Sequence, residues 1–197
     1  MKPKTALYIS VICHPLITLP LFTIVTLASK EEVKDALLHS SIIILGLFLP
    51  LTLSMYKKYK KGSYTDFDVS NKTERRSWYK TACMLLLMVT IVLFATEQPR
   101  ELRMPVFFSL LLLLSSQIMN YFINRSLHVA LTIFLAFLTL PMNLEIAVIF
   151  IMLTILVGWA RIILNRHTVI EVLAGFIIGT CFGISSLLFA DFGRCSS

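Results

Sequence analysis

The stretch TVIEVLAGFIIGTCFGISSLLFA, Thr168–Ala190, contains Glu171 as its only charged residue. A run of this length can cross the roughly 30 Å hydrocarbon core of a bilayer as an α-helix, which takes about 20 residues. A strand of a membrane barrel would alternate apolar and polar residues over about ten positions, whereas this run is continuously apolar. The stretch therefore predicts a membrane-spanning helix.

Further runs of similar texture precede it, and 57% of the 197 residues are hydrophobic, which excludes an ordinary soluble domain. We expect one all-α membrane domain over residues 1–197. It would be a polytopic helical bundle of about seven transmembrane helices, or six if the fifth and sixth runs merge. The seven runs lie near 6–28, 36–56, 78–96, 104–121, 126–144, 145–164 and 168–190.

Polar residues gather in three places between these runs. With seven spans, the loops after the second, fourth and sixth helices open on the face that also holds the N-terminus. These loops hold residues 57–80, 124–128 and 161–167, and they carry most of the 18 lysines and arginines. The positive-inside rule makes this face cytoplasmic. We expect the polar loop over 57–77 to contribute to a site there.

The third polar cluster comprises Arg161, Arg166, His167 and Glu171. Ionisable groups at membrane depth by default face a cavity, a partner or a substrate. His167 and Glu171 share a helix face at a spacing of four, and a carboxylate beside an imidazole fixes its tautomer. An arginine offers a planar fork of donors that suits phosphate oxygens. The alternative is structural: Thr168 and Glu171 form a capping box, and the arginines snorkel to the membrane surface.

The second cluster, Asn124–His128, stands at the start of the fifth expected helix. Backbone N–H groups at a helix N-terminus bind anions, which would place Arg125 and Ser126 beside a phosphate. The alternative is that Ser126 is an ordinary N-cap and that His128 is an interface histidine.

The first cluster, Asn71–Arg76, precedes the third expected helix. By composition it is a basic loop near anionic head groups. The alternative is a clamp on a phosphate through Lys72 and Arg75 or Arg76, with Glu74 orienting an arginine. Two histidines and several arginines on one face favour phosphoryl transfer from an anionic substrate without metal, and the four cysteines share no metal-ligand spacing.

The pattern Arg161, five residues, His167, three residues, Glu171 resembles the third signature of the type 2 phosphatidic acid phosphatase superfamily. That signature runs Ser-Arg, five residues, His, three residues, Asp. The sequence RSLH, Arg125–His128, resembles the second signature, usually Pro-Ser-Gly-His. NKTER, Asn71–Arg75, is similar to the shortened first signature of small bacterial members.

The resemblance covers roughly residues 66–180, and four positions depart from it. Ala160 replaces the usual Ser, Glu171 the usual Asp, and Arg125 and Leu127 the usual Pro and Gly. These departures place the strongest part of the resemblance in the third signature.

The resemblance implies roles for the matching residues. His167 would attack phosphorus and form a phosphohistidine, while Glu171 holds its imidazole. His128 would protonate the departing lipid alkoxide and then help to activate water. The residues that would bind the substrate phosphate are Arg161, Lys72, Arg75, Ser126 and Arg125.

The expected function is therefore that of a hydrolase that removes phosphate from a lipid phosphomonoester, phosphatidic acid or phosphatidylglycerol phosphate. We expect no cofactor, no metal and no nucleic-acid partner, with membrane lipids around a multi-pass protein of the bacterial inner membrane. One alternative is an undecaprenyl diphosphate or lipid A phosphatase. Another is a non-catalytic lipid-binding or transport protein, which the altered second signature and Glu171 motivate.

Overall fold

The computed structural model of the protein describes residues 4–66, 69, 71–122 and 125–192, with the side chains of all but Lys30, Lys72 and residues 190–192. The described residues are helical, with turns and bends between the helices. The chain folds as two compact units, one formed by Met1–Pro15 with Glu97–Ser197 and the other by Leu16–Thr96.

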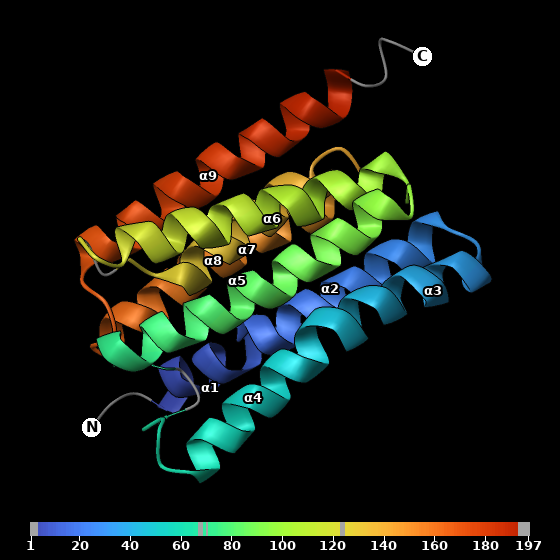
Figure 1. Cartoon of the computed structure of the whole chain (residues 1–197). Helices are drawn as coiled ribbons and strands as arrows, with labels where there is room; N and C mark the ends of the chain where they lie inside the picture. Colours follow the sequence, from blue (N-terminus) through green and yellow to red (C-terminus); the bar gives the residue numbers. More distant parts are fainter. Residues whose placement is uncertain (1–3, 67–68, 70, 123–124, 193–197) are drawn as a thin grey trace. The chain divides into compact units, whose positions relative to one another are not determined.

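The first unit is built around two parallel helices, α7 (Leu127–Thr139) and α9 (Val169–Phe192). Its helices are α1 (Lys4–Ile12), α6 (Arg100–Met119), α7 (Leu127–Thr139), α8 (Leu144–Ile163) and α9 (Val169–Phe192). Helix α9 packs along α7 and α6, α8 packs on α7, and α1 packs on α8 (Figure 1). Helices α7 and α9 begin at the same end of the unit, because Ser126, just before α7, lies against Gly175 in α9. Helix α8 terminates at that end, shortly before α9 begins.

Helix α7 is the core of this unit. Nine of its 13 residues are buried, including Phe134, which is 1% exposed. At 1.5 Å per residue the helix is roughly 20 Å long, shorter than the hydrocarbon core of a bilayer. The fifth expected run is thus a short interior helix instead of a span of 126–144. It does not merge with the sixth, because the chain turns at 140–143 and Asn143 caps α8 by accepting a 3.1 Å hydrogen bond from the Ile146 amide.

Close approach of α7 and α9 depends on glycines spaced four residues apart on α9. A Cβ at Gly175 would collide with the backbone of Ser126, and one at Gly179 with the backbone of Ala130. A Cβ at Gly183 would lie 2.6 Å from the ring of Phe137. Small residues at this spacing let membrane helices approach to backbone contact. The glycines therefore set the register between the two helices.

The second unit contains one long helical segment packed on another. Its elements are α2 (Pro15–Lys30), α3 (Val33–Ile43), the π-helical turn η1 (Ile44–Phe48), α4 (Leu49–Lys60) and α5 (Lys72–Ala95). Helices α3 and α4 are continuous through η1, and α5 packs against η1 and α4 (Figure 1). Because helix occupies both ends of the segment 57–77, the expected polar loop is confined to the residues between α4 and α5.

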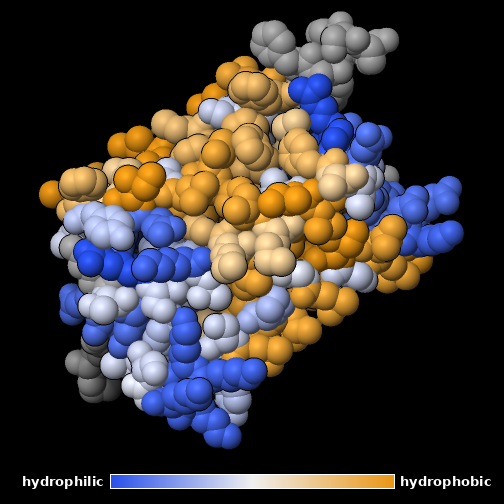
Figure 2. Space-filling view, in the orientation of Figure 1, coloured by the Kyte–Doolittle hydropathy of each residue, from blue (hydrophilic) through white to orange (hydrophobic). Residues whose placement is uncertain are grey.

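Length and composition make the chain a multi-pass integral membrane protein. The described residues include five helical segments long and apolar enough to cross a membrane, or six if α1 and α2 count as one broken span. Apolar side chains form much of the exposed surface (Figure 2), as on α9, where Ile177 is 59% exposed. The predicted all-α polytopic bundle is confirmed. Its described residues give five or six spans, where about seven were expected, or six if the fifth and sixth runs merged.

Replacing Gly179 by alanine should destabilise the first unit, because the new Cβ would meet the Ala130 carbonyl and force α7 away from α9. We expect a loss of about 1–3 kcal/mol in unfolding free energy, seen as a lower unfolding temperature in detergent micelles. Ile177→Ala is the matched control, because it also introduces an alanine on α9 and changes the side-chain volume more, but at an exposed position. A Gly179→Ala protein as stable as this control would contradict the close approach.

Candidate active site

The second and third polar clusters meet at one end of the first unit. The Ser126 amide donates a 3.1 Å hydrogen bond to the carbonyl oxygen of Glu171, which joins the start of α7 to the first turn of α9. The amides of Arg166 and His167 donate to the carbonyl oxygen of Arg161 at 3.0 and 3.3 Å. Backbone hydrogen bonds thus join the end of α8 to the turn that carries His167, and the first turn of α9 to the start of α7.

His167 and Glu171 form a bonded pair, as their spacing predicts. The Nδ1–H of His167 donates to Oε2 of Glu171 at 3.0 Å, since a carboxylate can only accept. The His167 side chain is 7% exposed and that of Glu171 is 20% exposed. Because Nδ1 is engaged by the carboxylate, a nucleophilic role for this imidazole would use Nε2.

The capping box is present as well. Oε2 of Glu171 accepts a 3.1 Å hydrogen bond from the Thr168 amide, and the Glu171 amide donates to Oγ1 of Thr168 at 3.3 Å. The same carboxylate oxygen therefore caps α9 and holds the imidazole of His167. The two interpretations of this segment, structural and chemical, are compatible.

Two arginine side chains are enclosed in this unit. Arg125 and Arg161 are each 2% exposed and are among the largest fully buried side chains in the described part of the chain. Taking a guanidinium out of water costs several kcal/mol unless other groups compensate. Arg161 lies in the last turn of α8, where the negative end of the helix dipole favours a cation. Arg125 directly precedes the N-cap of α7. Because both side chains are buried, neither extends to the membrane surface as snorkelling would require.

Ser126 occupies the N-cap position of α7, but its side chain makes no capping hydrogen bond. The residue is 0% exposed, and among the described residues its Oγ has no hydrogen-bond partner. The expectation that Ser126 is an ordinary N-cap is therefore wrong for its hydroxyl, because the Ser126 amide and the helix end are organised by the Glu171 carbonyl. Asn124 lies outside the described residues.

His14 joins this end of the unit and was not predicted from the sequence. Its ring packs edge-on against that of His128, with centroids 5.0 Å apart and planes at 79°. His14 lies where the chain leaves α1, because Pro15 after it disfavours a helical conformation at position 14. Helix α1 is held on α8 by the packing of Ala6 against Ala160. The signal in the sequence that could have indicated His14 is a histidine directly before a proline within an apolar run.

The first cluster belongs to the other unit, where it organises the loop between α4 and α5. Asn71 caps α5 by accepting a 3.0 Å hydrogen bond from the Thr73 amide. Oε2 of Glu74 accepts from the amide and hydroxyl of Thr65 at 3.1 and 3.3 Å, so in the described residues Glu74 holds the loop and does not orient an arginine.

Two cations of this cluster were expected to bind phosphate. Nε of Arg75 donates to the carbonyl oxygen of Val69 at 3.3 Å, and Val69 has a φ of 46°. The side chain of Lys72 lies outside those described. The structure describes this cluster within its own unit, separately from the residues around His167.

No group of three or more His, Cys, Asp or Glu residues that could hold a metal occurs among the described residues. Comparison with known proteins gives no match, whether to a protein-family model, to a curated protein or to a solved structure. The case for a function therefore depends on the chemistry of the residues themselves.

Replacing Thr168 by valine should weaken the start of α9, because it removes the hydroxyl that accepts from the Glu171 amide. We expect a loss of about 1 kcal/mol in unfolding free energy, measured by denaturant titration in micelles. Thr23→Val is the control, since that hydroxyl only bonds back to Leu19 within its helix. Equal stability of the two variants would show that the capping box contributes nothing.

Proposed function

We propose that the protein is a metal-independent lipid phosphatase that acts through a covalent phosphohistidine. The observation that carries the proposal is the His167 side chain, 7% exposed and bonded through Nδ1 to Glu171 at 3.0 Å, at the end of the unit where Arg125 and Arg161 are enclosed. A nucleophilic imidazole needs an orienting acid, and a phosphoryl group needs cations around it. Both requirements are met by residues that the polar clusters predicted.

In the proposed first step, Nε2 of His167 attacks phosphorus, and the bond from phosphorus to the lipid oxygen breaks. Glu171 stabilises the positive charge that develops on the imidazole. His128 donates a proton to the departing alkoxide. In the second step water attacks the phosphohistidine, His128 takes a proton from that water, and the bond between phosphorus and nitrogen breaks. Inorganic phosphate leaves, and His167 is regenerated.

The negative charge of the transferred group requires fixed donors. Arg161 and Arg125 supply guanidinium groups from the end of α8 and the start of α7, and their burial strengthens their interaction with an anion. The buried hydroxyl of Ser126 is a further donor at the N-terminus of α7. Lys72 and Arg75, which the sequence resemblance also assigns to phosphate binding, belong to the other unit and stay predictions from the sequence.

The proposed substrate is a lipid phosphomonoester, phosphatidic acid or phosphatidylglycerol phosphate, at the cytoplasmic face of a bacterial inner membrane. A site on membrane-embedded helices would receive such a substrate from the bilayer. The carboxylate of Glu171 reaches the imidazole despite being one methylene longer than the Asp of the family signature. This contact removes one argument for a non-catalytic relative, namely that the longer side chain could not hold the imidazole.

His167→Ala should abolish phosphate release, by at least about a thousandfold, from every lipid phosphate that the wild-type protein hydrolyses. Phosphate release would be measured for purified protein over a panel of lipid phosphomonoesters and diphosphates. The matched control is His39→Ala, because His39 is also buried and bonded through Nδ1 to a carboxylate, that of Glu31 at 2.6 Å.

When the reaction is run with substrate labelled in its phosphate and is quenched during turnover, label should remain on the peptide that contains His167. Full activity of His167→Ala, or equal losses in both histidine variants, would overturn the mechanism. A wild-type protein that neither releases phosphate nor binds vanadate would favour the non-catalytic alternative.

His14 is a positioning residue in this scheme, since its ring lies against that of His128. We expect His14→Ala to lower kcat by roughly tenfold with little change in KM, because the proton donor loses its lateral support. His14→Phe keeps a flat ring at the contact and should restore kcat to within about twofold of wild type. If Phe and Ala were equally impaired, ring packing would not be how His14 acts.

A further inference from the structure

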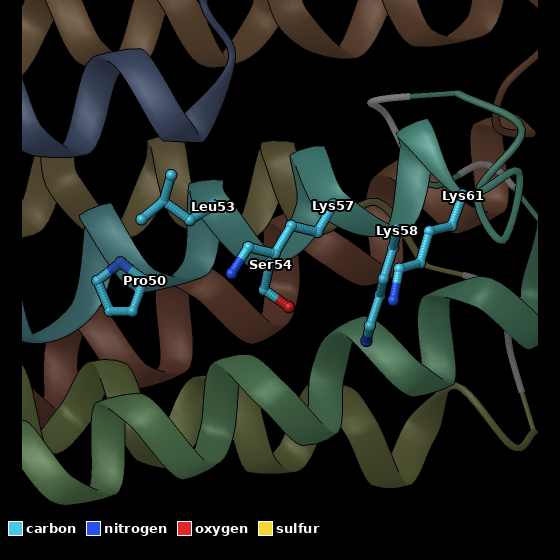
Figure 3. A pocket seen from close by; sticks show the side chains of 6 residues that line it. All are labelled: Pro50, Leu53, Ser54, Lys57, Lys58 and Lys61. Carbon is cyan, nitrogen blue, oxygen red and sulfur yellow. The ribbon is translucent and has the colours of Figure 1, made fainter.

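A groove runs along the last turns of α4, in the second unit. It has a volume of about 420 Å³ and joins an apolar part to a basic part (Figure 3). Lys58 and Lys61 extend side by side from the end of the helix, and Lys57 reaches back towards Ser54 (Figure 3). The residues that line the groove are Pro50, Leu53, Ser54, Lys57, Lys58 and Lys61.

From the length of its helix, we expect the groove to lie at the boundary between hydrocarbon and head groups. The helical segment Val33–Lys60 has 28 residues, so it is roughly 42 Å long and exceeds a hydrocarbon core of about 30 Å. The end that carries the lysines therefore reaches the head-group layer. Leu53, which is 48% exposed, lies one turn deeper along the helix, within reach of acyl chains.

The lysines are not needed to cap α4. The helix ends in a Schellman motif, in which the Gly62 amide donates to the Tyr59 carbonyl at 3.0 Å and the Ser63 amide donates to the Lys58 carbonyl at 2.9 Å. Gly62 has a φ of 71°, the left-handed conformation that this motif requires. Since these backbone bonds satisfy the Lys58 and Tyr59 carbonyls, the lysine side chains are not required to cap them.

Lys58 is held in place by neutral groups. Its Nζ donates to the hydroxyls of Tyr64 and Ser77 at 3.2 and 2.9 Å, and it lies 5.2 Å from the centroid of the Tyr64 ring. An ammonium group has three donors, so one remains. The structure thus positions a cation at the mouth of the groove without neutralising it.

Lys57 and Lys61 are four residues apart on one face of the helix end, where like charges repel and are destabilising. Among the described residues, no carboxylate forms a salt bridge with either of them or with Lys58. An anion between the lysines would relieve this repulsion. The positive charge of the lysines, the apolar side chains that line the rest of the groove and its expected position near the head groups together suit a lipid with an anionic head group.

We propose that this groove binds an anionic phospholipid, with the lipid phosphate among Lys57, Lys58 and Lys61 and an acyl chain along Pro50 and Leu53. The residues that line the groove are not among those proposed for phosphate transfer, and the proposal does not depend on that function. The bound lipid is a ligand that is not consumed, held at the membrane surface by the second unit.

The test uses full-length protein in nanodiscs of equal amounts of phosphatidylglycerol and phosphatidylcholine. Phosphatidylglycerol is a phosphodiester and so is not a substrate of a phosphomonoesterase. Native mass spectrometry after gentle release counts the lipids that each protein retains. The groove variant is Lys57→Gln/Lys61→Gln. The control, Lys60→Gln/Lys80→Gln, removes the same charge from two lysines outside the groove lining.

Wild-type and control proteins should retain phosphatidylglycerol over phosphatidylcholine by roughly tenfold, and the groove variant should show nearly equal retention. Unchanged preference in the groove variant would overturn the proposal, and so would equal losses in both variants, which would indicate general surface charge. Excess inorganic phosphate should leave the preference intact. Displacement by phosphate would show that the groove takes a soluble anion and not a lipid. Unfolding temperatures of the variants exclude loss of fold as the cause.

Discussion

The close contact between α7 and α9 is the constraint on which the arrangement of the first unit depends. Gly175 faces the backbone of Ser126, and any side chain at that position would separate the two helices. Only at this distance can the Ser126 amide reach the Glu171 carbonyl. The start of α7 is thereby fixed against the first turn of α9. His128 and His167 are 39 positions apart along the chain, but the helix ends at which they lie are close together.

Burying charge in such a bundle is costly, and the position of Arg161 shows how the fold lowers that cost for one of the two buried arginines. Arg161 takes the last turn of α8, where the helix dipole favours a cation, and it remains 2% exposed. Arg125 is equally buried just before α7. A membrane protein without a use for such groups gains stability by replacing them with apolar residues. Two such groups at the end of the unit that holds the bonded His167 are the observation on which the proposal of an anionic substrate depends.

The sequence predicted the helical class, the polar clusters and the pairing of His167 with Glu171, because these follow from hydrophobic run length and from helical periodicity. It predicted the wrong role for the run 126–144, since hydrophobicity does not distinguish a lipid-facing span from α7, which is apolar because it is buried in protein. The contact of His14 with His128 joins residues more than a hundred positions apart, and local spacing carries no information on it. The glycines of α9 were visible, but their partner helix was not.

A histidine bonded to a carboxylate is not by itself a sign of catalysis, and this chain contains the comparison. His39 bonds Glu31 at 2.6 Å and His167 bonds Glu171 at 3.0 Å, and both imidazoles are 7% exposed. Helix α3, which carries His39, has Ala36, Ser40 and Ile43 as its other buried residues and contains no arginine. Around His167 the backbone instead joins two helix starts to a helix end that holds buried Arg161. The pair supplies an oriented nitrogen in both places, and what distinguishes the surroundings of His167 in the described residues is the pair of buried guanidinium groups, Arg125 and Arg161, at the same end of its unit.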